Sequence, residues 1–115
     1  MPRLAGTRRV DLAKVAAYLL NERHPDGGPK ARFFIGLGFD PANPALLRQA
    51  LLAHPTSNEV IATGVDEFGV RSVVQCRISS PDGRDPCIRS VWMQDSGVQE
   101  QRLVTAYPAP QRSSR

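Results

Sequence analysis

Hydrophobic residues follow a helical period in the first half of the chain and a strand period in the second half. Leu12, Val15, Ala16 and Leu19 recur at the spacing i, i+3, i+4, i+7, which places them on one face of a helix. This pattern predicts a helix over about residues 10–21. The glycines and prolines that follow end the helix, because neither residue type favours a helix interior.

Two more helices are predicted before the pattern changes. Pro29 suits the first turn of a second helix, and Gly36 marks the end of that helix. Asn43 followed by Pro44 is a typical helix opening, because the amide side chain caps the first turn and proline needs no N–H there. A third helix is therefore predicted over about residues 44–53, and a His–Pro pair ends it.

Four strands are predicted in the second half, over about residues 59–65, 70–79, 84–93 and 102–107, where side chains alternate between apolar and polar. Short polar turns join them, among them Ser80–Gly83. Turns of this length join antiparallel neighbours, since a parallel crossover needs a much longer connection. The sequence thus predicts an α+β fold with the N-terminal helices packed on one face of a four-stranded antiparallel sheet.

A chain of 115 residues suits one domain with one core. The domain is predicted to span residues 10–108, with flexible termini at 1–9 and 109–115. The predicted core is made of apolar residues on the inward faces of these elements: Leu12, Val15, Leu19, Phe34, Leu47, Leu51, Val74, Ile78, Val91 and Val104.

The charge of the chain, its cysteines and its lack of a visible targeting segment limit the classes of function that we expect. The net charge of +4 and the pI of about 9.7 are compatible with a nucleic-acid partner. Cys76 and Cys87 have no metal-ligand spacing around them, so free thiols, no metal and no cofactor are expected. His54 is expected on the surface near a helix end. No signal peptide or membrane-length apolar run is visible, so we expect a cytoplasmic protein without membrane contact.

The first candidate site is the segment from His24 to Phe34, with the sequence HPDGGPKARFF. A glycine loop before a helix start can bring backbone N–H groups close to an anion, and Lys30 adds a positive charge. His24 can transfer a proton near neutral pH, and Arg32 is a candidate substrate-binding residue. The alternative is a solvated helix–loop–helix connection in which the histidine lies near a helix end.

A second candidate cluster lies in the last two strands. Arg89 is flanked by apolar residues in a strand, so it must point to an open face or be paired. Alternation gives Thr105 and Tyr107 a common face in the last strand, and Arg102 is a further candidate for substrate binding. The alternative is an ordinary solvated face, since arginine, threonine and tyrosine are common at such positions.

The motifs HPDGGPKARFF, LGF, IRSVW and RLVTAYP resemble those of an uncharacterised bacterial domain family. The resemblance covers about residues 12–108, nearly the whole predicted domain. It implies a small domain that occurs alone, beside a gene for a small β-rich protein, or as the tail of a large secreted toxin.

A more distant resemblance is to the barnase–EndoU–colicin–RelE type of metal-independent ribonuclease. By position it implies that His24 is the general base or acid, and that Lys30 and Arg89 hold the scissile phosphate. Thr105 would bond a phosphate oxygen, and Tyr107 would contact a base. These proteins often carry a second histidine or a glutamate, and this chain has no match for it.

The sequence leaves three functions open. The first is a toxin-like ribonuclease that cleaves RNA by 2′-hydroxyl transesterification and pairs with a small neutralising protein. The second is a non-enzymatic module that binds a small β-rich partner, and the third is an RNA-binding accessory domain. Catalysis requires the candidate side chains to converge on one cleft, whereas the binding functions do not.

Overall fold

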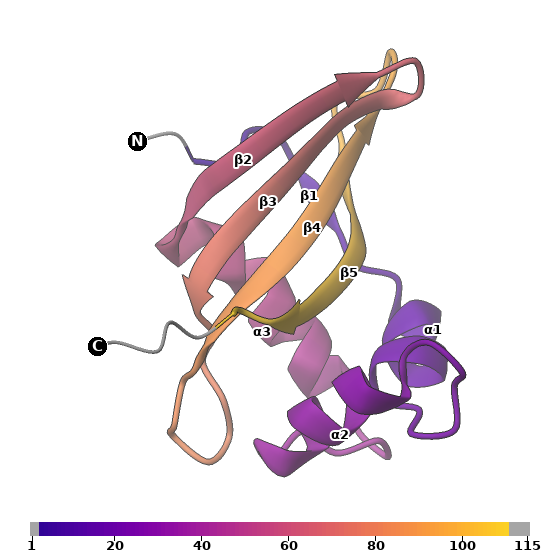
Figure 1. The fold of residues 1–115 in the computed structure, drawn as a ribbon, viewed down its shortest axis with the longest axis vertical. Coiled ribbons are helices and arrows are strands. Elements are labelled where there is room, and N and C mark those ends of the chain that lie inside the picture. The colour runs from indigo at the N-terminus through magenta and orange to yellow at the C-terminus, as the bar shows by residue number, and fades with distance from the viewer. Residues whose placement is uncertain (1–2, 111–115) are drawn as a thin grey trace.

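The computed structural model describes residues 3–110, which form three α-helices and a five-stranded mixed sheet (Figure 1). The predicted α+β class is confirmed. In chain order the elements are β1 (Arg8–Arg9), α1 (Leu12–Lys14), the π-helical segment η1 (Val15–Leu19), α2 (Gly28–Gly36), α3 (Pro44–Ser57), β2 (Glu59–Asp66), β3 (Gly69–Arg77), β4 (Cys87–Asp95) and β5 (Gln101–Pro108).

The strand order is β1-β5-β4-β3-β2, and β2 to β5 form the predicted antiparallel meander. The prediction of a wholly antiparallel four-stranded sheet is wrong because β1 adds a fifth strand, parallel to β5. Arg8 pairs with Gln101 and Arg9 with Arg102. A strand of two residues has no alternation that a sequence pattern can reveal.

The N-terminal segment, predicted to be flexible up to residue 9, is part of the packed domain from Arg3 onward. Leu4 is buried, and Arg3 donates a hydrogen bond of 2.9 Å to the carbonyl oxygen of Thr56 on α3. Most of the tail expected to be flexible, 111–115, lies outside the described residues, as do residues 1–2.

The third helix is longer than predicted and includes the proline that was expected to end it. α3 continues through Pro55 to Ser57. Proline has no N–H, so position 55 cannot bond the carbonyl oxygen of Leu51, and the helix ends within the same turn. The side-chain amide of Asn58 then donates to the carbonyl oxygen of His54 at 2.9 Å, which satisfies one of the free carbonyls at this end.

His54 is buried, so its predicted surface position is wrong. Its Nδ1 lies 2.8 Å from Oγ of Ser90, and its Nε2 lies 2.9 Å from the carbonyl oxygen of Cys76. Because a carbonyl only accepts, Nε2 carries the hydrogen and Nδ1 accepts from the Ser90 hydroxyl. Trp92 Nε1 donates to the same hydroxyl at 2.8 Å. Burial lowers the pKa of His54, partly offset by its bond to Cys76.

The two faces of the sheet differ in whether α3 covers them. Val74, Ser90 and Ala106 align across β3, β4 and β5, are all fully buried, and belong to the face that α3 covers from behind in Figure 1. On the opposite face Arg89 is partly exposed and lies next to Tyr107 in the same register.

The predicted core is mostly correct. Val15, Leu19, Phe34, Leu47, Leu51, Val74, Ile78 and Val91 are buried. Val104 is only half-buried, and Leu12 is wrong because its side chain is 44% exposed. Leu12 is the first residue of the helix. The buried side chains of this helical segment, Val15 and Leu19, come after it.

Candidate functional site at the free edge of strand β5

An open groove lies where the N-terminal helices meet β5. β1 pairs only with Gln101 and Arg102, the first two residues of β5, and further along this strand Thr105 meets side chains of η1 and α2. The groove has a volume of about 510 Å³, within the range of small-ligand sites. It is lined by Lys14, Tyr18, His24, Val104 and Thr105, a set that contains no carboxylate.

Tyr18, Lys30 and Thr105 form a closed triangle of hydrogen bonds at this groove. Lys30 Nζ donates to Tyr18 Oη at 2.5 Å and to Thr105 Oγ1 at 3.2 Å. The two hydroxyl oxygens are also 3.2 Å apart. The triangle joins η1, α2 and β5, so the cluster exists only when all three are packed together.

A second lysine lies near the Tyr18 ring. Lys14 Nζ donates to the carbonyl oxygen of Val104 at 3.2 Å and lies 5.7 Å from the centre of the Tyr18 ring. Lys30 Nζ lies 5.0 Å from the same centre. Burial by itself would raise the pKa of Tyr18, but hydrogen bonds from Lys30 and Thr105 and the charges of both lysines lower it below its ordinary value.

The π-helical turn of η1 sets the direction of Tyr18. The N–H of Leu20 bonds to the carbonyl oxygen of Val15 at 2.9 Å, which is an i→i+5 bond. Val15, Leu19 and Leu20 are all buried in the core. Because these three side chains point into the core, the Tyr18 side chain lies at the groove. Lys14, four residues earlier, lies on the same side of the helix.

The loop before α2 differs from the predicted anion-binding loop. His24 Nδ1 accepts hydrogen bonds from the backbone N–H groups of Asp26 and Gly27, both at 3.0 Å, and its carbonyl oxygen accepts from Gly28 at 3.0 Å. The amides that were expected to bind a phosphate are thus used by His24 itself. With Nδ1 as acceptor, the neutral ring carries its hydrogen on Nε2.

The loop glycines make room for protein atoms. A Cβ on Gly27 would lie 2.6 Å from Cδ1 of the Tyr18 ring, and one on Gly28 would lie 2.7 Å from the carbonyl oxygen of Glu22. The His24 ring meets the Tyr18 ring edge to face, with centres 4.9 Å apart and an interplanar angle of 76°. The loop therefore fixes the place of the phenol ring.

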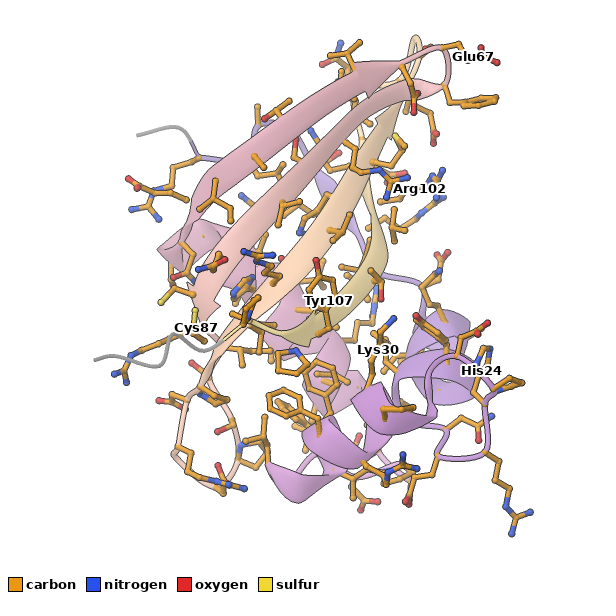
Figure 2. The ribbon with its side chains drawn as sticks, in the orientation of Figure 1. His24, Lys30, Glu67, Cys87, Arg102 and Tyr107 are labelled. Atoms are coloured by element: carbon orange, nitrogen blue, oxygen red, sulfur yellow. The ribbon has the colours of Figure 1, made fainter. Side chains whose placement is uncertain are left out.

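Two other predicted site residues, Tyr107 and Arg89, lie outside this triangle. Tyr107 is two residues beyond Thr105 on β5, beside Arg89, whose Nε donates to Gln75 Oε1 at 2.6 Å. Figure 2 shows Lys30 between β5 and the helices, with Tyr107 on the strand side and His24 on the outer loop.

Two predicted substrate-binding residues stand apart from the groove. Arg32 is an exposed residue of α2. Arg102 lies toward the opposite end of the sheet from Lys30 (Figure 2), and its Nε donates to Asp95 Oδ2 at 2.8 Å. The structure therefore brings together His24, Lys30 and Thr105, but not these two arginines.

Sequence reasoning missed Tyr18 and Lys14. One signal was available, because lysine occurs only at positions 14 and 30 among the fifteen basic residues, and the remainder are arginines. Lys14 and Tyr18 are also four residues apart, which places them on one side of a helix.

The described residues were also compared with the requirements of a metal site and of a membrane-spanning helix. Between Arg3 and Pro110, His, Cys, Asp and Glu side chains do not gather in any group of three that could hold a metal ion. No helix in the same range has the length and apolarity to cross a bilayer.

Comparisons with known proteins identify the family. The sequence profile of DUF6883, a domain of unknown function, matches residues 3–110. The chain belongs to the DUF6883 family. No curated protein gives a significant match. The match includes the segment before residue 10, in agreement with the packing of β1.

The fold of this DUF6883 domain recurs in a solved structure, a contact-dependent growth inhibition toxin–immunity protein complex from Klebsiella pneumoniae 342. The TM-score is 0.67 at 18% sequence identity, and the alignment covers 87% of this chain and 98% of the chain it matches. At this level of identity the comparison establishes a shared fold.

Proposed function

We propose that this domain is a toxin-like, metal-independent ribonuclease that cleaves RNA by attack of a 2′-hydroxyl on the adjacent phosphate. The observation that carries the proposal is the convergence of Lys30, Tyr18 and Thr105 on an open groove whose lining contains no carboxylate. Such a groove favours an anionic ligand, because Lys14 lines it, Lys30 is bonded to two of its lining residues, and no acid is among the lining residues.

The reaction needs two things from a protein: stabilisation of the charge that grows on the phosphorus oxygens, and proton transfer. In the proposed complex the scissile phosphate lies at the groove, where Lys14 and Lys30 supply positive charge. In this complex the Thr105 hydroxyl turns its single hydrogen from Tyr18 to a phosphate oxygen. Loss of one such preorganised donor typically costs about 10²–10³-fold in rate.

The open face of the sheet extends the proposed binding surface. Tyr107 lies two residues beyond Thr105 and presents a ring on which an RNA base can stack. Arg89 is its neighbour in register, and its charge is available to a flanking phosphate. We keep Arg32 as a proposed RNA contact, and we propose no role for Arg102 because it is paired with Asp95.

The shared fold with a chain of a toxin–immunity protein complex supports a toxin-like role and a neutralising protein partner. A partner that inhibits such an enzyme would cover the groove. Acidic side chains on that partner would complement the two lysines.

The test is cleavage of a single-stranded RNA oligonucleotide by the folded protein in the presence of EDTA. We expect products that end in a 2′,3′-cyclic phosphate, the chemical signature of 2′-hydroxyl attack. Lys30→Met should lower the rate by about 10²–10³-fold. Arg84→Met is the matched control, because it removes an exposed positive charge on the β3–β4 loop and should leave the rate unchanged. Intact RNA at high concentration of folded protein would overturn the proposal.

A second candidate function is a partner-binding module without catalysis. It is favoured by two observations: the backbone amides of the loop are used by His24, and the Arg89 side chain is held by Gln75. In that case RNA stays intact, and Lys30→Met has no effect on RNA while it weakens binding of the partner protein.

A further inference from the structure

The hydrogen bonds of His24 restrict what this residue can do. Two backbone N–H groups point at Nδ1, so that nitrogen is an acceptor and the neutral ring carries its hydrogen on Nε2. A ring in this form has no free lone pair with which to take a proton from an RNA hydroxyl. For Nε2 to have a free lone pair, the hydrogen would have to move to Nδ1. It would then point at the N–H groups of Asp26 and Gly27, and both hydrogen bonds to Nδ1 would be lost.

Tyr18 has the geometry that His24 lacks. Its hydroxyl is at the groove and receives a hydrogen bond from Lys30 at 2.5 Å. The groups that face it are Lys14 from α1, Lys30 from α2, His24 from the loop and Thr105 from β5. Both charged neighbours are ammonium groups, which stabilise a phenolate, and they lower the pKa of the phenol.

We propose that Tyr18 in its ionised form, bonded to Lys30 and with the charge of Lys14 nearby, is the general base of the reaction, and that His24 is a positioning residue. This assignment rests on the proposed ribonuclease function. The Tyr18 oxygen takes the proton of the 2′-hydroxyl while the 2′-oxygen forms its bond to phosphorus. The bond from phosphorus to the 5′-oxygen breaks, and the leaving 5′-oxygen takes a proton from the Lys30 ammonium.

The direct bond between the two residues closes the proton cycle. After one turnover Tyr18 is a neutral phenol and Lys30 a neutral amine, and the proton passes from Oη to Nζ along their hydrogen bond. The use of lysine fits this step. Arginine does not release a proton in proteins, and this arginine-rich chain places its two lysines beside the same phenol, that of Tyr18.

Kinetics separate the roles of the two residues. Tyr18→Phe keeps the ring but removes the hydroxyl, and it should lower the cleavage rate by about 10²–10⁴-fold. In the wild type the rate should rise with pH and level off below the ordinary tyrosine pKa of about 10, and this rise should be absent in Tyr18→Phe. Lys30→Arg keeps the charge but cannot supply the proton, so we expect a loss of about 10²-fold.

His24 variants test positioning. His24→Ala should lower the rate without changing the shape of the pH profile, because the base is still present. His24→Asn offers a side-chain oxygen to the same two amides and should restore part of the rate. If the pH-dependent rise disappears in both His24 variants and persists in Tyr18→Phe, the assignment is overturned.

An optical titration tests Tyr18 without any RNA. In a Tyr107→Phe background Tyr18 is the one remaining tyrosine, and its ionisation is followed by ultraviolet absorbance. Its midpoint should lie below that of free tyrosine and should rise in Lys30→Met. RNA cleavage with an unchanged rate in Tyr18→Phe would overturn this inference and leave the proposed function standing. A lowered midpoint without any cleavage by the wild type would overturn the proposed function and the base role with it.

Discussion

Gly27 and Tyr18 are packed so closely that position 27 has no room for a side chain. A Cβ there would lie 2.6 Å from both Cδ1 and the carbonyl oxygen of Tyr18. The backbone contact cannot be relieved by a change of rotamer. The absence of a side chain at Gly27 therefore allows the Tyr18 ring to lie where it does at the groove.

Gly27→Ala should therefore destabilise the domain by about 1–3 kcal/mol, the usual cost of overpacking. It should also lower any activity that depends on Tyr18. Gly36→Ala is the matched control, because a Cβ at that position of α2 meets nothing within 4 Å. It should stabilise the helix by about 0.5–1 kcal/mol. Urea unfolding of both variants measures the difference, and equal stabilities would contradict this account.

The stability of the domain should fall as the pH is lowered from about 6.5 toward 5. The folded-state pKa of His54 is lowered by burial, so the unfolded chain binds a proton in this window and the folded chain does not. The free energy of unfolding then rises with pH up to the unfolded pKa and is constant above it. Asp82, with a pKa of about 2, does not contribute in this window.

Urea unfolding at pH 7.5 and pH 5 tests the role of His54. His54→Gln removes the titrating group, so its pH dependence should be smaller than that of the wild type. The same dependence in both proteins would assign the effect to another group.

Leu19→Ala and Phe34→Ala should each destabilise the domain by about 2–5 kcal/mol, because both side chains are fully buried. Leu12→Ala should cost much less, since Leu12 is exposed. Thermal or urea unfolding of the three variants checks which sides of the first helical segment and of α2 face inward. A large cost at Leu12 would reverse that assignment.

The two cysteines should differ in reactivity. Burial raises the pKa of the Cys87 thiol to about 11, and the neighbouring Cys76 adds to the rise. Cys76 is exposed. Iodoacetamide at pH 8 should therefore label Cys76 first, because the thiolate is the nucleophile. Peptide mass spectrometry locates the label, and two equivalents should be consumed after unfolding. Faster labelling of Cys87 would contradict the prediction.

The parts of the fold that sequence reasoning predicted well are those with a sustained period. The four strands of the meander and the inward side of α3 have enough residues for alternation or helical spacing to be visible. β1 has two residues and pairs with a strand about ninety positions away, so nothing local predicts it. His54 follows Leu47 and Leu51 at helical spacing, and its burial could have been predicted had a histidine been allowed on that face.

The candidate site was predicted only in part for a similar reason. Lys30 and Thr105 were identified, but Tyr18 lies within an apolar helix pattern and is turned to the groove by a π-helical turn. Sequence spacing alone does not reveal such a turn. The glycine loop was interpreted as an anion-binding site. In the structure the space beside Gly27 is filled by the ring of Tyr18.

The residues of the closed triangle are synthesised at widely separated times. Tyr18 and Lys30 are 87 and 75 residues from Thr105, so the two helices leave the ribosome long before the strand that completes the triangle. Throughout most of synthesis the nascent chain carries the lysines and the phenol without their assembled arrangement. The cluster is therefore complete only after β5 has been added to the sheet.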